Sequence, residues 1–213
     1  TSVQNLIGKA INTDYSTATI ALIKISDERY TELIFDTIKY VYDYGPIESR
    51  AAILYKFAYL LNLDKIKAKE FFVDFINREN NIYVLSSSLW SFSYMRFHCL
   101  EEVLPGYNAL IDSQLFGKDD CQSFFVSIYG LYLEGNINMK PIILDLFKNQ
   151  RKYLSTFLRV ILKNYYYDND NVIEINNYLL DKLLDAASKD NEEELNWSFL
   201  NAEYLKLLDI YPF

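Results

Sequence analysis

Hydrophobic and polar positions alternate along most of this chain with the period of an α-helix. Between residues 28 and 44, apolar residues recur three, four and seven positions apart, which places one helical face on Tyr30, Leu33, Ile34, Ile38, Val41 and Tyr42. Ser26 is the expected N-cap of this helix, and Gly45-Pro46 is its expected end. No segment shows the strict alternation of a β-strand. The chain is therefore predicted to be all-α.

The predicted helices follow one another at regular intervals. They begin near residues 28, 47, 65, 82, 119, 140, 151, 171 and 192, with a break at Pro105-Gly106 and a short helix over 107–115. The usual step is about 20 residues, so that two helices make about 40, the period of two-helix solenoid repeats. This spacing predicts stacked antiparallel helix pairs in a short α-solenoid. The alternative is an irregular multi-helix bundle, because the spacing falters between residues 100 and 118.

One stretch resembles a known repeat family. The segment Asp43-Tyr44-Gly45-Pro46-Ile47-Glu48-Ser49-Arg50-Ala51-Ala52 is similar to the turn and second-helix start of a HEAT repeat, with an Asp, a Pro, an Arg and small residues in that order. The resemblance is local and covers about one helix pair. The period alone does not separate HEAT-like or armadillo-like pairs from TPR-like ones, although the TPR pattern of Trp, Gly, Tyr and Pro at fixed offsets is not visible. It implies a curved scaffold that binds proteins, peptides or occasionally nucleic acid on one face.

Few residues in this sequence are of the kind that break helices. The 213 residues include 6 Gly and 4 Pro, and 51% of them are hydrophobic. No linker rich in Gly, Ser or Pro divides the chain, so a single helical repeat domain over 1–213 is expected. The sequence begins at Thr1 rather than Met, which is also compatible with a fragment of a larger protein.

The charge of the chain narrows the choice of partners. The net charge is -8 and the isoelectric point is about 4.7. An acidic surface disfavours nucleic acid and anionic membranes, and it attracts a basic protein by long-range steering. No apolar run is long enough to span a bilayer. Cys99 and Cys121 form neither a disulfide framework nor a metal motif, which favours a reducing, cytoplasmic location.

The sequence contains little that predicts catalysis. His98 is the single histidine, which excludes a zinc site built on several histidines. It cannot face Cys99 because neighbouring helical residues diverge, although Cys121 remains an alternative partner. Asp168-Asn169-Asp170 lacks the later ligands of a calcium loop. No catalytic residue, cofactor or metal ligand is predicted.

Two stretches are candidates for protein binding. The first is the serine- and aromatic-rich segment 86–96, with Trp90, Tyr94 and Arg96 as anchors, because Trp, Tyr and Arg are enriched in binding hot spots. The second is the run Tyr165-Tyr166-Tyr167, in which the three rings cannot all face the core. Each has a structural alternative: the serines allow close helix packing, and the tyrosines plug a helix end.

The favoured function is a non-catalytic protein-interaction module, with an inhibitor or immunity-type protein that binds a basic enzyme as its most specific form. A helical-repeat peptide or ligand sensor in a regulator is the second hypothesis. A helical enzyme that uses His98 or its carboxylates is the third. A fold alone does not choose among them.

Overall fold

The computed structural model describes residues 3–25, 27–113 and 118–163, together with 173–175, 177, 178 and 181. All regular structure in these residues is helical, which confirms the all-α prediction. The chain divides into two compact units, Thr1–Phe116 and Gly117–Phe213. Ser26, Tyr165, Tyr166 and Tyr167 lie outside the described residues, as do the predicted helix from 192 and most of the one from 171.

The first unit contains two more helices than the sequence pattern predicted. Its elements are α1 (Val3–Asn12), α2 (Asp14–Ile23), η1 (Glu28–Tyr30), α3 (Thr31–Tyr44), α4 (Ile47–Lys56), η2 (Phe57–Asn62), α5 (Lys65–Arg78), α6 (Ile82–Ser87) and α7 (Leu89–Ile111). Two of the four residues that α2 buries, Ser16 and Thr19, are polar. A hydrophobic periodicity therefore fails to detect this helix.

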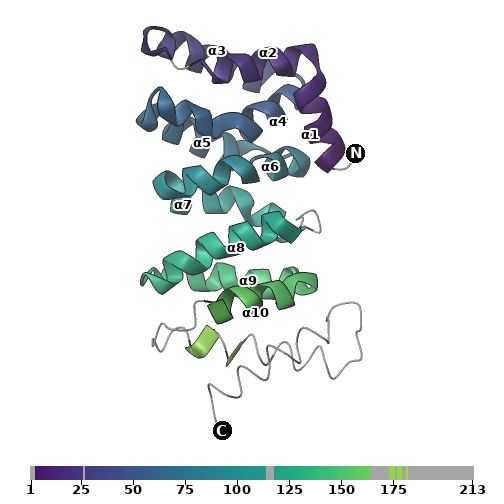
Figure 1. Ribbon diagram of the computed structural model, residues 1–213, viewed down its shortest axis with the longest axis vertical. Helices are drawn as coiled ribbons and strands as arrows, with labels where there is room; N and C mark the ends of the chain where they lie inside the picture. The colour runs from purple at the N-terminus through teal and green to yellow at the C-terminus, as the bar shows by residue number, and fades with distance from the viewer. Residues whose placement is uncertain are drawn as a thin grey trace. The chain divides into compact units, whose positions relative to one another are not determined.

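The helices of the first unit form two layers. In one layer α4 packs between α2 and α6; in the other, α5 packs along α7 (Figure 1). Aromatic contacts join α3 to α5, with the Tyr42 ring stacked on Phe75 and the Phe35 ring edge-on to Phe71. Helix α1 contacts α2, α4 and α6, and buries Leu6 and Ala10.

Polar caps set several helix ends where the sequence predicts them. The Asp64 carboxylate accepts hydrogen bonds from the amides of Ile66 and Lys67 at the start of α5. The Asn81 side chain does the same for α6 through the amides of Tyr83 and Val84. Each cap satisfies amides that have no partner inside the helix, and so fixes where the helix begins.

Helix α3 exposes part of the face that the sequence pattern assigned to the core. Ile34, Ile38 and Tyr42 are buried as expected, but Tyr30 and Leu33 are exposed. Tyr30 belongs to η1, which precedes α3 and turns with a different period. A single continuous helical face over residues 30–42 was therefore the wrong expectation.

The predicted break at Pro105-Gly106 is also wrong. Both residues lie inside α7, and the helix instead kinks at Cys99, where φ is -151° and ψ is 29°. The Asn77 side chain of α5 explains how the helix continues: its amide donates to the Glu102 carbonyl oxygen (2.8 Å) and accepts from the Gly106 amide (3.0 Å). These two backbone groups pair with each other in a regular helix, so Asn77 bridges them from outside.

Gly106 serves close packing rather than a turn. A Cβ at this position would lie 2.5 Å from the backbone oxygen of Ile76 on α5. Only glycine therefore allows α5 and α7 to approach as closely as they do.

The second unit packs around three phenylalanine rings. Its described elements are α8 (Lys118–Leu133), η3 (Ile137–Met139), α9 (Lys140–Asn149), η4 (Arg151–Tyr153) and α10 (Leu154–Lys163). Phe125, Phe147 and Phe157 bring α8, α9 and α10 together, with ring centroids 4.5 to 5.7 Å apart. After α8, Gly135 takes a positive φ of 100°, a conformation that favours glycine and that commonly ends a helix.

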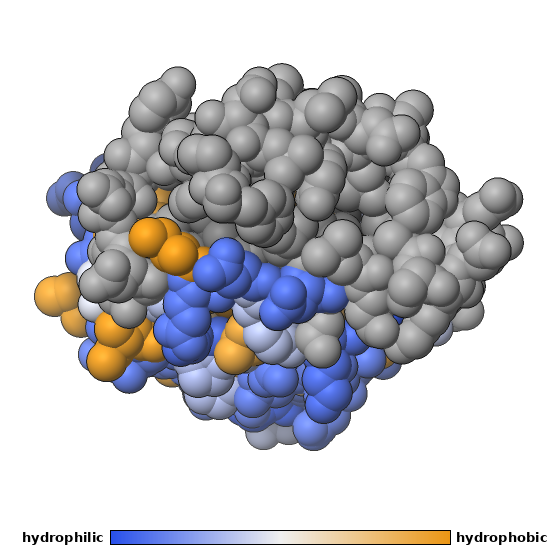
Figure 2. All heavy atoms as spheres, turned by 90° about the horizontal axis from the view of Figure 1, so that it is seen from below, coloured by the Kyte–Doolittle hydropathy of each residue, from blue (hydrophilic) through white to orange (hydrophobic). Residues whose placement is uncertain are grey.

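Some large hydrophobic side chains of the described residues are exposed, among them Tyr15, Ile66 and Phe97. Among the described residues visible in Figure 2, most are hydrophilic and the hydrophobic ones form small groups. None of the described helices is long and apolar enough to cross a membrane.

Candidate functional site

A shallow groove in the first unit contains two of the predicted binding residues. Its volume is about 280 Å³, and it lies between η2 and the start of α7. We call it the Trp90 groove; it is lined by Ala58, Tyr59, Leu61, Asn62, Trp90 and Tyr94. Trp90 and Tyr94 are one helical turn apart, so the same face of α7 presents both rings.

The aromatic side chains at this groove contact one another. The Trp90 ring lies 5.8 Å from Tyr59 in a stacked arrangement, 5.1 Å from Tyr94 and 5.8 Å from Tyr55, centroid to centroid. We call these four residues the Trp90 cluster. Tyr94 is 50% exposed and Tyr59 is 36% exposed, while Trp90 is half-buried. The cluster thus holds its rings in place and still leaves ring surface open to solvent.

Ser91 explains how α4 and η2 bring their tyrosines to Trp90. Its hydroxyl donates to the Tyr55 carbonyl oxygen (3.1 Å) and accepts from the Ala58 amide (3.2 Å). These backbone groups flank the point where α4 passes into η2. The buried serine therefore stabilises the turn that carries Tyr55 and Tyr59, and its small side chain lets α7 approach α4, as the structural alternative for this segment predicts.

Two lysines adjoin the Trp90 cluster. The Lys56 ammonium lies 4.3 Å from the Tyr55 ring centroid and 4.6 Å from that of Trp90, and it is half-buried. The ammonium of Lys24, at the end of α2, lies 6.0 Å from the Tyr59 centroid, as does that of Lys56. Burial, and then the positive charge of Lys24, lower the pKa of Lys56.

Arg96 does not line the Trp90 groove. It points away from the face that carries Trp90 and Tyr94, because six residues of helix turn a side chain well past that face. Its guanidinium lies over the ring of Phe97, 4.6 Å from the centroid, and burial lowers the pKa of Arg96. The structure thus brings two of the three predicted anchors together.

Sequence reasoning missed five residues at or near this site: Lys24, Tyr55, Lys56, Tyr59 and Phe97. Tyr55, Lys56 and Tyr59 belong to a different helix pair, and only the tertiary fold brings them to Trp90. Phe97, which is 75% exposed, continues the face of Trp90 and Tyr94 along α7. Its spacing of three from Tyr94 was visible in the sequence.

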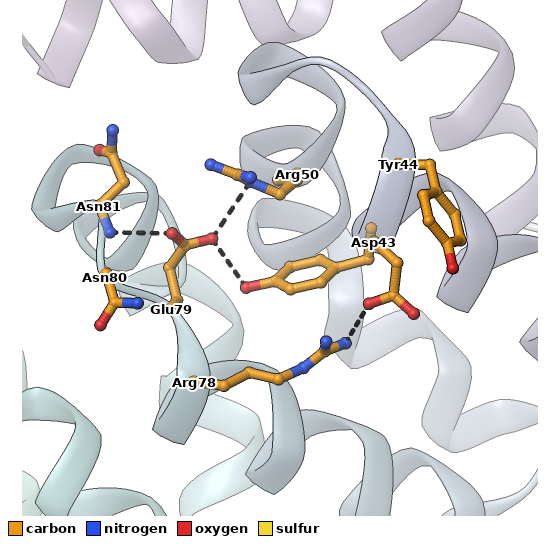
Figure 3. A pocket seen from close by; sticks show the side chains of 8 residues that line it. Asp43, Tyr44, Arg50, Arg78, Glu79, Asn80 and Asn81 are labelled. Atoms are coloured by element: carbon orange, nitrogen blue, oxygen red, sulfur yellow. Dashed lines mark hydrogen bonds and ion pairs between the residues drawn. The ribbon is translucent and has the colours of Figure 1, made fainter.

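A second pocket lies where the turns of two successive helix pairs meet. It encloses about 820 Å³ between the ends of α3 and α5 and the starts of α4 and α6. We call it the turn pocket (Figure 3); its lining residues are Tyr42, Asp43, Tyr44, Arg50, Arg78, Glu79, Asn80 and Asn81. Three of them, Asp43, Tyr44 and Arg50, belong to the segment that resembles a HEAT repeat.

Ion pairs cross the turn pocket from one helix pair to the next. Arg78 contacts the Asp43 carboxylate at 2.5 Å, and Arg50 contacts Glu79 at 3.3 Å (Figure 3). Glu79, whose side chain is 5% exposed, also accepts from the Tyr42 hydroxyl (2.9 Å) and from the Asn81 amide (2.8 Å). The first three of these contacts join the α3–α4 turn to the α5–α6 turn, and we call them the clasp.

The same contacts fix the protonation states in the clasp. Burial alone would raise the pKa of Asp43, but hydrogen bonds from Lys39 and Arg78 outweigh it and lower that pKa. Burial and the neighbouring Glu79 carboxylate raise the pKa of Tyr42. Asp43 is therefore ionised and Tyr42 neutral at pH 7, and the charged groups of the clasp are already paired.

His98 and the two cysteines differ in exposure. His98 is exposed, whereas Cys99 is buried, and burial raises the pKa of the Cys99 thiol to about 12. Cys121 is buried in the second unit. Within the described residues, no three His, Cys, Asp or Glu side chains gather in a way that could hold a metal ion.

Known proteins give no guide to this site. No family model, curated protein or solved structure matches the chain. The function must therefore be argued from the groove, the turn pocket and their surroundings.

Proposed function

We propose that this chain is a non-catalytic protein-interaction module that binds a peptide segment of a protein partner in the Trp90 groove. The observation that carries the proposal is the Trp90 cluster itself, in which stacked rings line a groove and keep exposed surface. Rigid aromatic side chains lose little conformational entropy on binding, and Trp and Tyr dominate the energetics of many interfaces.

The groove lining suits binding better than proton transfer. It consists of aromatic rings, aliphatic side chains and the Asn62 amide. The lining contains no carboxylate, histidine or cysteine, the groups that most often serve as general acids, general bases or nucleophiles. An amide beside aromatic rings can instead hydrogen-bond the backbone of an extended peptide while apolar side chains of that peptide cover the rings.

The arrangement of helices supports a scaffold role. Layers built from α2, α4 and α6 and from α3, α5 and α7 fit a short α-solenoid, and the clasp between successive turns fits the HEAT-like resemblance. Scaffolds of this class present binding residues from several helices at fixed positions. The Trp90 cluster, drawn from α4, η2 and α7, is such a surface.

The experiment that tests this proposal uses a randomised peptide display library as its probe. The immobilised chain should enrich peptides that contain apolar or aromatic residues, and Tyr94→Ala should abolish their binding. Tyr15→Ala is the matched control because Tyr15 is 78% exposed on α2 and does not belong to the groove. Absence of any enriched peptide, or equal loss in both variants, would contradict a binding role for the groove.

The turn pocket supports a second candidate function, a ligand sensor. Asn80 and Tyr44 are exposed in a pocket of about 820 Å³, and both can hydrogen-bond a polar small molecule. Thermal denaturation of the chain against a panel of polar metabolites tests this candidate. A compound that raises the melting temperature of the chain but not that of Asn80→Ala would support this candidate. If no compound in the panel raises the melting temperature, the tested metabolites are excluded as ligands.

The acidic net charge of -8 supports the inhibitor version of the leading proposal, in which a basic partner is attracted by the surface as a whole. The Trp90 groove differs locally, since Lys24 and Lys56 lie against the rings of Tyr59 and Trp90 that line it.

A further inference from the structure

We propose that the Trp90 groove selects an acidic peptide segment, with a carboxylate of the partner held by Lys24 and Lys56 and an apolar side chain laid against Trp90 and Tyr94. This inference rests on the proposed peptide-binding function and specifies the chemistry of the partner. It runs against the net charge of the chain, which taken alone favours a basic partner.

Lys24 and Lys56 have no carboxylate within 4.0 Å of their ammonium groups among the described residues. Lys9 and Lys65 also lack one, but Lys24 and Lys56 are the ones that lie against rings of the Trp90 cluster. Six other cations of the first unit are paired with a carboxylate. Those paired cations are Arg29, Lys39, Arg50, Lys67, Lys69 and Arg78. Lys24 and Lys56 are thus positive charges that the fold leaves available next to a groove.

Lys24 and Lys56 lie near the same ring and repel each other. Both ammonium groups lie 6.0 Å from the centroid of the Tyr59 ring, and the positive charge of Lys24 lowers the pKa of Lys56. Ring faces attract cations but do not neutralise them. An anion between the two lysines would relieve this repulsion, and a cationic segment would add to it.

The partial burial of Lys56 also favours an acidic partner. Desolvation disfavours its charged form, which lowers its pKa, and a nearby carboxylate would favour that form again. A hydrogen bond between charged groups in a partly dry site is stronger than an exposed surface pair. The acidic residue of the partner would therefore contribute to affinity as well as to specificity.

The test uses three synthetic peptides that share one apolar core, Leu-Pro-Leu, and carry glutamate, glutamine or lysine on both sides of it. Binding of each labelled peptide to the full chain is measured by fluorescence anisotropy. We expect the glutamate peptide to bind about tenfold more tightly than the glutamine peptide, as expected for one to two charge-assisted contacts. The lysine peptide should bind most weakly.

Variants assign the effect to the two lysines. The double variant Lys24→Gln and Lys56→Gln should bind the glutamate and glutamine peptides equally, while Lys9→Gln, an exposed lysine on α1, should keep the preference. If the glutamine and lysine peptides bind as tightly as the glutamate peptide, and Tyr94→Ala weakens all three, the acidic preference is refuted and the peptide-binding function stands. If none of the three binds, both proposals fail for this groove.

Discussion

Gly106 offers a sharp test of how the first unit is packed. An alanine Cβ at this position would lie 2.5 Å from the Ile76 backbone oxygen and 2.8 Å from the Ile76 carbonyl carbon. Contacts this short are repulsive, and a backbone atom cannot rotate away as a side chain can. Helices α5 and α7 must therefore separate by several tenths of an ångström, which weakens the packing along their contact.

The expected cost of Gly106→Ala is about 1 to 3 kcal/mol, the range for an overpacked interior site. The separation would also strain the hydrogen bond from the Gly106 amide to Asn77. Gly8→Ala is the matched control: Gly8 lies inside α1, and a Cβ there would have nothing within 4 Å. Since alanine is the better helix former, Gly8→Ala should stabilise the unit by about 0.5 to 1 kcal/mol.

Urea denaturation measures both effects. Replacement of Trp197 by phenylalanine in every protein leaves Trp90 as the single tryptophan, so that its fluorescence reports on the first unit. Opposite signs for the two glycine variants are expected. Equal stability changes, or stabilisation by Gly106→Ala, would refute the close approach of α5 and α7.

Three further predictions concern the turn pocket and the cysteines. Glu79→Ala should lower the free energy of unfolding by about 2 to 4 kcal/mol, because it leaves the half-buried Arg50 guanidinium without its carboxylate and takes from the Tyr42 hydroxyl the nearer of its two acceptors. Glu102→Ala, at an exposed ion pair, should give no resolved change. Equal effects of the two substitutions in urea denaturation would contradict the clasp. The folded-state pKa of Asp43 lies below its usual value of 3.8, so its ionised form contributes stability that is present above that pH and lost as pH falls through the folded-state pKa. In Asp43→Asn, the free energy of unfolding should therefore fall less steeply on acidification. Identical pH profiles of the two proteins would contradict the pairing of Asp43 with Lys39 and Arg78. Cys99 and Cys121 should resist a thiol reagent such as DTNB at pH 8 in the native protein and react fully in guanidinium chloride, because both are buried. Rapid labelling of the native protein would contradict the burial of these thiols.

Local sequence signals predicted the helices well where one physical cause decides the outcome. The predicted helix start near residue 65 is an example, and α5 begins at Lys65. Its apolar residues Ala68, Phe72, Phe75 and Ile76 recur at helical spacing, and all four are buried. Asp64 fixes its start, because a carboxylate at the N-cap accepts hydrogen bonds from amides that have no partner in the helix.

The predictions of helix positions failed for two reasons: a residue distant in the sequence can override a local rule, and a helix can bury polar residues. Pro105-Gly106 has the composition of a helix break, yet Asn77 from another helix bridges the backbone groups there. Helix α2 was missed because it buries Ser16 and Thr19, which a hydrophobic pattern counts as exposed.

The candidate site could likewise be predicted only in part from the sequence. Trp90 and Tyr94 could be paired from the sequence because a spacing of four puts them on one helical face. Their contacts with Tyr59 and Lys56 depend on how α4, η2 and α7 pack, which no local pattern contains. The net charge of the whole chain does not predict the local charge at the Trp90 groove, because an acidic protein can place two lysines beside one groove.

The central claim is that a peptide binds at the Trp90 cluster. The most direct measurement is the NMR signal of the Trp90 indole N–H during titration with a library-selected peptide, assigned with the Trp197→Phe protein. A saturable shift of this signal, with the same dissociation constant as anisotropy gives and no shift in Tyr94→Ala, is the predicted result. A peptide that binds without moving the Trp90 signal would contradict the claim.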